Sequence, residues 1–124
     1  MPLKSEATRW KWLGVMVRQP PSSFLKVEEA LRLAVAAASK DVRTDVVFCG
    51  PGAGVLRPSV PMDKGEAFDL ENMLEMLRQL GGSVLGELES IPEAERGALR
   101  SEAQLVPSAD LLRRLTERDF NLVF

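Results

Sequence analysis

Short apolar runs alternate with amphipathic stretches along the chain, and this alternation constrains the fold more than any other feature. Strand-length runs occur at residues 12–17, 44–49, 83–85, 103–106 and 120–124. Helical spacing of apolar side chains marks residues 24–39 and 69–80, a short helix is predicted over 90–100, and a last helix after Ser108. Strands that alternate with helices favour a parallel sheet covered on both faces. We therefore expect a single α/β domain over residues 1–124, with a mostly parallel five-stranded sheet.

Prolines, glycines and small polar residues separate these elements. Pro20 and Pro21 end the first strand, since proline cannot continue a hydrogen-bonded ladder. Serine or aspartate at positions 22 or 23, 69, 90 and 108 is predicted to cap a helix. Residues 1–10 form a polar N-terminal segment. Residues 50–68 are predicted to form a long, mobile loop, and a structureless loop of this length is usually functional or disordered.

Charge and residue usage exclude several classes of function. Sixteen basic and eighteen acidic residues give a net charge of −2, which argues against general nucleic-acid binding. The chain has no histidine and one cysteine, so histidine-dependent triads, histidine-ligated metals, thiolate zinc clusters and internal disulfides are excluded. We expect no metal and no cofactor. Without a signal peptide or a run of about 18 apolar residues, no membrane is expected and the predicted compartment is the cytoplasm.

Any ligand site is expected at the carboxyl ends of the parallel strands, where such folds bind ligands. Three segments follow predicted strands there: Arg18 to Pro21, Cys49 to Gly54, and Gly86 with Glu87. A flavodoxin-like order places the first strand between the second and the third, which would make these segments neighbours. A flavin or nucleotide is disfavoured because Pro20 and Pro21 occupy the place of a phosphate loop. The predicted ligand-binding residues are Arg18, Gly50, Gly52, Gly54, Gly86 and Glu87.

The single thiol, Cys49, has two interpretations. A reactive thiol needs exposure and a lowered pKa, which the amides of Gly50, Gly52 and Gly54 could supply as a nest of N–H groups. A lone cysteine at a strand end is more often a buried, inert packing residue. The glycine-rich segment likewise either holds an anion or only turns the chain. It has no Gly-Lys-Ser/Thr motif, which favours the turn.

Two tryptophans near the N-terminus, Trp10 and Trp12, lie at alternate positions and so point to one face of a strand. Large aromatic side chains favour interfaces between subunits, and packing in the core is the other interpretation.

Four segments together resemble the DsrE/DsrF/TusD-like sulfur-relay proteins. They are the strand and proline turn at residues 15–21, the alanine-rich helix at 29–38, the strand with a glycine-rich exit at 46–55, and the ending at 105–124. The resemblance implies a small α/β domain of the DsrEFH type that assembles into a homo-oligomer, a trimer or a hexamer. It also implies a role in intracellular sulfur transfer, with a sulfur-relay protein as partner.

The chain departs from the family at the residue that carries sulfur. Sulfur-carrying members have a cysteine after the third strand, whereas this chain has Gly82 to Glu87 there, without a thiol. The resemblance therefore implies a non-catalytic or atypical member. If the chain does transfer sulfur, Cys49 is the candidate carrier. The alternative is a structural or interaction protein that binds a small ligand or a partner at the carboxyl ends of the strands.

Overall fold

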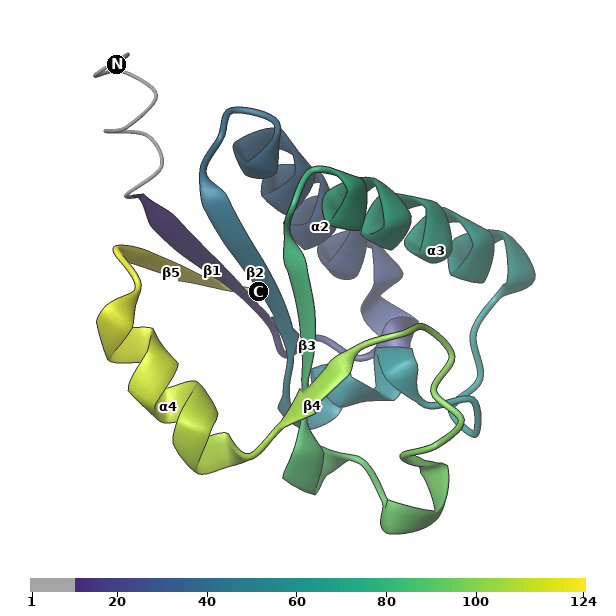
Figure 1. Ribbon diagram of the computed structural model, residues 1–124. Coiled ribbons are helices and arrows are strands. Elements are labelled where there is room, and N and C mark those ends of the chain that lie inside the picture. The colour runs from purple at the N-terminus through teal and green to yellow at the C-terminus, as the bar shows by residue number, and fades with distance from the viewer. Residues whose placement is uncertain (1–10) are drawn as a thin grey trace.

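A computed structural model describes residues 11–124, and its centre is a five-stranded sheet (Figure 1). All four strand pairings are parallel, which confirms the predicted α/β class. The strands are β1 (Trp12–Val17), β2 (Arg43–Phe48), β3 (Ser83–Glu87), β4 (Gln104–Val106) and β5 (Phe120–Val123). The helices are α2 (Phe24–Ala38), α3 (Lys64–Gln79) and α4 (Ser108–Glu117).

The strand order is β4-β3-β2-β1-β5, which differs from the predicted flavodoxin-like order. The first strand does not lie between the second and the third, because β2 separates β1 from β3. The chain adds β2, β3 and β4 in one direction, and α4 then carries it back across the sheet to β5 beside β1. The carboxyl ends of β1, β2 and β3 remain consecutive along one sheet edge.

Helices cover both faces of the sheet, as the alternation predicts. Helices α2 and α3 lie side by side on one face and α4 lies on the other (Figure 1). The larger core is on the α2/α3 face, where Val15, Val46 and Phe48 of the sheet are completely buried. The smaller core, on the α4 face, contains Met16, Val47, Cys49, Leu85, Val106 and Leu111.

The segment after β2 is more ordered than the sequence predicts. Residues 50–56 form a 3-10 helix (Gly50–Leu56) in which every residue from Gly52 onward is buried. Helix α3 begins at Lys64, and Asp63 caps it by accepting hydrogen bonds from the amides of Gly65 and Glu66. The predicted cap at Asp69 is therefore wrong, and the segment without regular structure shrinks to residues 57–63. Apolar residues of the 50–56 segment are the reason, since Val55 and Leu56 pack into the core.

The helix predicted over residues 90–100 does not form. The connection from β3 to β4 instead contains two short 3-10 turns, Leu88–Ser90 and Glu93–Glu95. The sequence there has too few apolar positions to bury a helical face, and Ile91 alone is completely buried. Arg100 anchors the connection, because its Nη1 donates to the carbonyl of Val55 at 2.8 Å.

Candidate functional site

Three adjacent strands bring Arg18, Cys49 and Glu87 to the carboxyl edge of the sheet. Arg18 follows β1, Cys49 follows β2, and Glu87 is the last residue of β3. The amide of Cys49 donates to the carbonyl of Val17 at 3.0 Å, which fixes the exit of β2 against that of β1. The side chain of Arg18 is exposed and lies over Gly50, with Nη2 3.1 Å from the position that a Cβ of Gly50 would occupy. The three segments predicted to be neighbours do meet, although β3 contacts β2 instead of β1.

Glu87 is held by three hydrogen bonds from three different segments. Its Oε1 accepts from the amide of Gly50 at 3.1 Å and from the hydroxyl of Ser90. Its Oε2 accepts from the hydroxyl of Ser108 at 2.9 Å. These hydrogen bonds, led by that from Ser90, and the nearby Arg18 charge lower the pKa of Glu87 against the opposing effect of burial. Glu87 is therefore an ionised carboxylate at neutral pH.

A second carboxylate, Glu89, extends this cluster to the start of α4. Its Oε1 accepts from the amide of Ser108 at 2.9 Å and lies 3.0 Å from the Ser108 hydroxyl, whose one proton is shared between Glu87 and Glu89. The amide hydrogen bond lowers the pKa of Glu89. A negative charge is favourable at this place, because the first amides of a helix have no partners within the helix. We call Arg18, Glu87, Glu89, Ser90 and Ser108 the carboxyl-end cluster.

Sequence reasoning did not place Ser90, Ser108 or Glu89 in the site. The sequence predicts that both serines cap helices, but neither caps a helix with its side chain. Each hydroxyl donates to a carboxylate instead. The available signal was the position of Ser108 directly after a strand and Pro107, which places it at the same sheet edge as Glu87.

Cys49 lies at this edge, but it faces the core under α4. It is 5% exposed and packs with Met16, Val47 and Leu85. Burial is the largest effect on its thiol and raises the pKa, while the neighbouring Arg18 charge lowers it by less. The thiol therefore stays protonated at neutral pH, and its Sγ lies 3.9 Å from the carbonyl of Val17.

The predicted glycine residues do not form a nest of amides around the thiol. The amide of Gly50 donates to Glu87, and that of Gly52 donates to the carbonyl of Cys49 at 3.0 Å. A Cβ on Gly52 would lie 1.9 Å from the carbonyl oxygen of Val17, so this position requires glycine for close backbone contact. Gly54 is buried beside Pro21, and Gly86 is enclosed within β3 by Leu56 and Leu105. Of the predicted glycines, Gly50 alone contacts the carboxyl-end cluster.

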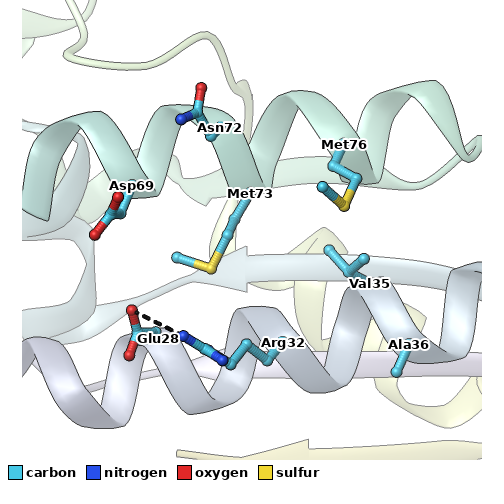
Figure 2. Close-up of a pocket in the computed structure, with 8 residues that line it drawn as sticks. All are labelled: Glu28, Arg32, Val35, Ala36, Asp69, Asn72, Met73 and Met76. Atoms are coloured by element: carbon cyan, nitrogen blue, oxygen red, sulfur yellow. Dashed lines mark ion pairs between the residues drawn. The ribbon is translucent and has the colours of Figure 1, made fainter.

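A groove of about 430 Å³ lies elsewhere, between α2 and α3 (Figure 2). Met76 of α3 points toward Val35 of α2 across it, and Met73 points toward Glu28 and Arg32, which pair at 3.5 Å on the rim. Half of its eight lining residues are aliphatic or thioether, and the carboxylates of Glu28 and Asp69 lie at one end. The groove does not share a residue with the carboxyl-end cluster.

The described residues, 11–124, contain no group of three or more potential metal ligands. Among the same residues, no helix combines the length and the apolar character required to cross a bilayer.

Comparison with known proteins identifies the fold. No family model and no curated protein sequence matches the chain. Among solved structures, the YchN protein from E. coli superimposes with a TM-score of 0.68 at 20% sequence identity, over 92% of this chain and 98% of that chain. At an identity this low, the match shows a shared arrangement of helices and strands but says nothing about the binding or catalytic activity of this chain. The chain has a DsrE/YchN-like fold.

Proposed function

We propose that this protein is a non-catalytic member of the DsrE/DsrF-like sulfur-relay proteins, which binds a partner or ligand at the carboxyl-end cluster and does not carry sulfur itself. The observation that carries the proposal is the residue at the end of the third strand. By the resemblance, a sulfur-carrying member has a cysteine after that strand. Here β3 ends in Glu87, an ionised carboxylate that three hydrogen-bond donors hold in place.

The one thiol of the chain is poorly suited to replace that cysteine. A persulfide forms when a thiolate attacks a donor, so the attacking sulfur must be deprotonated and accessible. Burial of Cys49 under α4 works against both requirements, because it raises the pKa and removes the sulfur from solvent. The amides that could stabilise a thiolate donate to other acceptors.

Incubation with a sulfur donor, followed by mass spectrometry of the intact protein, tests this proposal. We expect no adduct on the folded protein, whereas the protein unfolded in denaturant should gain about 32 Da on its accessible thiol. The unfolded sample is the positive control, and Cys49→Ser is the negative one. A stoichiometric gain of sulfur on the folded protein that Cys49→Ser abolishes would overturn the non-catalytic assignment.

Exposed Arg18 favours the recognition of an anionic group at this edge. Among the described residues its guanidinium makes no ion pair shorter than 4.0 Å, whereas Arg57 and Arg118 each have a carboxylate partner. A guanidinium can bind a carboxylate, a sulfate or an anionic sulfur compound through paired N–H donors. Arg18 is therefore the residue that we assign to ligand contact.

Two anions of equal charge distinguish the sulfur-relay function from general recognition of a partner. NMR titration with thiosulfate and with sulfate should shift the amides of Arg18 and Gly50, and Arg18→Gln should abolish both effects. Stronger binding of thiosulfate supports sulfur handling. Equal binding favours the second candidate, an interaction protein that recognises a carboxylate or another anion of its partner. No shift with either anion contradicts the assignment of Arg18.

A further inference from the structure

The groove between α2 and α3 is open along its length (Figure 2). It takes up about 430 Å³, yet none of its eight lining residues is buried, and Arg32, Asn72 and Met76 are exposed. A site for a small ligand usually encloses most of the ligand surface. A shallow channel between two helices is instead the shape into which a third helix packs. The groove therefore favours a helix over a small molecule.

Apolar side chains continue the groove at both of its ends. Leu25 precedes Glu28 by three residues, which places it on the groove side of α2. Leu80 follows Met76 by four residues, which places it on the groove side of α3. Leu25 is 78% exposed, Met76 is 51% exposed and Leu80 is 42% exposed. We call the following residues the apolar stripe: Leu25, Val35, Ala36, Met73, Met76 and Leu80.

Carboxylates accompany the apolar stripe at one end only. Glu28 and Asp69 lie toward the amino termini of α2 and α3, which run in the same direction (Figure 2). The pair between Glu28 and Arg32 is weak, because the Arg32 side chain is 72% exposed. Among the described residues Asp69 makes no ion pair, and as the sixth residue of α3 it lies past the first turn of that helix. This end of the groove therefore complements a positive charge.

We propose that the groove binds an amphipathic helix of a partner protein, with apolar side chains on the apolar stripe and lysine or arginine beside Glu28 and Asp69. Basic residues are favoured in the last turn of a helix, so the partner helix ends at the carboxylates and runs antiparallel to α2 and α3. Met73 and Met76 suit such a site, because flexible thioethers adapt to the side chains of a partner. This inference does not depend on the function proposed for the carboxyl-end cluster.

Binding of two synthetic helices to the whole protein tests the proposal. Each peptide has 16 residues, the length of α3, with leucines three and four residues apart on one face of an alanine-based helix. One peptide has two lysines in its last turn, and the other has glutamates at the same positions. Fluorescence anisotropy of the labelled peptides measures the dissociation constants. We expect about 10–100 µM for the lysine peptide and binding at least about fivefold weaker for the glutamate peptide.

Variants at exposed positions, which leave the core intact, show whether the peptide lies in the groove. Met76→Glu should raise the dissociation constant of the lysine peptide at least about tenfold, because it puts a charge in the apolar stripe. Leu112→Glu is the matched control and should leave that constant unchanged, since Leu112 is 64% exposed on α4, across the sheet from the groove. Asp69→Asn should weaken binding of the lysine peptide about threefold without weakening that of the glutamate peptide.

Several results would overturn the proposal. They are the absence of binding at millimolar lysine peptide, binding that Met76→Glu does not weaken, and equal binding of the two peptides. Self-association that Met76→Glu abolishes, measured by sedimentation, would identify a second copy as the occupant instead. Octylamine that binds as tightly as the lysine peptide would identify a small cation. A spin label at the amino end of the lysine peptide should broaden the NMR signals of Leu80, and broadening at Leu25 instead would contradict the antiparallel orientation.

Discussion

Two groups of charged side chains lie at opposite ends of the strands, and they differ in their access to water. The carboxyl-end cluster is half exposed, and its carboxylates accept hydrogen bonds from neutral donors. At the other end, Asp45 and Arg118 form an ion pair at 2.9 Å whose side chains are 4% and 0% exposed. Trp12 completes this second group, which we call the amino-end cluster, because its Nε1 donates to Asp45 at 3.0 Å.

The amino-end cluster joins three parts of the fold: β1, β2 and the connection between α4 and β5. Trp12 begins β1, Asp45 lies in β2, and Arg118 follows α4 just before β5. Arg43 stacks on the Trp12 ring at 3.6 Å from its centroid and contributes a cation–π interaction. A buried ion pair of this kind positions elements and offers little to a ligand. Burial gives the amino-end cluster a structural role, whereas the exposed carboxyl-end cluster is the site where we propose that a ligand or partner binds.

The largest effect is expected from breaking the buried pair. Asp45→Ala leaves the Arg118 charge without its partner in the interior, so we expect a loss of about 3–5 kcal/mol of unfolding free energy. The midpoint of thermal unfolding should fall by roughly 10–20 °C. Circular dichroism during heating and in urea measures both quantities.

Replacement of both Asp45 and Arg118 shows whether the stability at this place depends on the paired charges or on the packing of the side chains. Nη1 of Arg118 has no hydrogen-bond partner among the described residues, so the pair is incompletely satisfied. The double variant Asp45→Leu with Arg118→Met should therefore recover most of the stability lost in Asp45→Ala. A double variant as unstable as the single one would show that the hydrogen bond from Trp12 dominates this cluster.

At the carboxyl end of the strands, the largest loss of unfolding free energy is expected where two backbone segments are in close contact, at Gly52. Gly52→Ala puts a Cβ against the carbonyl oxygen of Val17, which cannot move without disturbing β1, and we expect a loss of about 2–3 kcal/mol. Gly97→Ala is the control, since a Cβ there meets nothing within 4 Å, and its effect should stay within about 0.5 kcal/mol. Equal effects at the two positions would remove the argument for a tight contact between the exits of β1 and β2.

The sequence predicts the carboxyl end better than the amino end. Strand exits are visible as glycine and proline after an apolar run, so Arg18, Cys49 and Glu87 could be placed at one edge without the structure. The strand order and the direction of the Cys49 side chain depend on tertiary packing. The predicted strand order was wrong. The reactivity of Cys49 depends on the burial and the pKa of its thiol, and the spacing of apolar residues in the sequence predicts neither.

The sequence does not predict the amino-end cluster, because its members are far apart in the chain: Asp45 lies 33 residues from Trp12 and 73 residues from Arg118. The sequence predicts that Trp12 is a subunit contact or a core residue, and it singles out neither Asp45 nor Arg118. Trp10, its predicted companion, lies outside the described residues. One signal was available in Gly14, since glycine within a strand marks a close approach. A Cβ there would lie 2.6 Å from Cδ of Arg118.

A smaller effect is expected at Glu87, and it should depend on pH. The pKa of Glu87 is lower in the folded protein than in the unfolded chain, so its contribution is complete above the unfolded value of about 4.3 and is lost as the pH falls through the folded value. Glu87→Gln should cost about 1 kcal/mol at neutral pH, since its hydrogen bonds are partly screened by solvent. The variant should also flatten the fall in stability below about pH 4.

Urea unfolding at a series of pH values measures this effect. Glu93→Gln is the control, because Glu93 is an exposed carboxylate in the same connection between β3 and β4. A Glu87→Gln profile parallel to that of the wild type would show that the hydrogen bonds do not distinguish the charged carboxylate from the neutral one.

A change in stability as small as that at Glu87 is expected at Cys49, which lies at the carboxyl end but belongs to the core beneath α4. Cys49→Ala removes one sulfur from a small apolar cluster and should cost about 1 kcal/mol. Its thiol should be alkylated at least about a thousandfold more slowly than in the unfolded protein, since reaction requires unfolding of the structure. The logarithm of the alkylation rate should then rise in Gly52→Ala and in Asp45→Ala in proportion to their loss of stability. A rate that follows neither variant would mean that the thiol is reached by a local opening under α4.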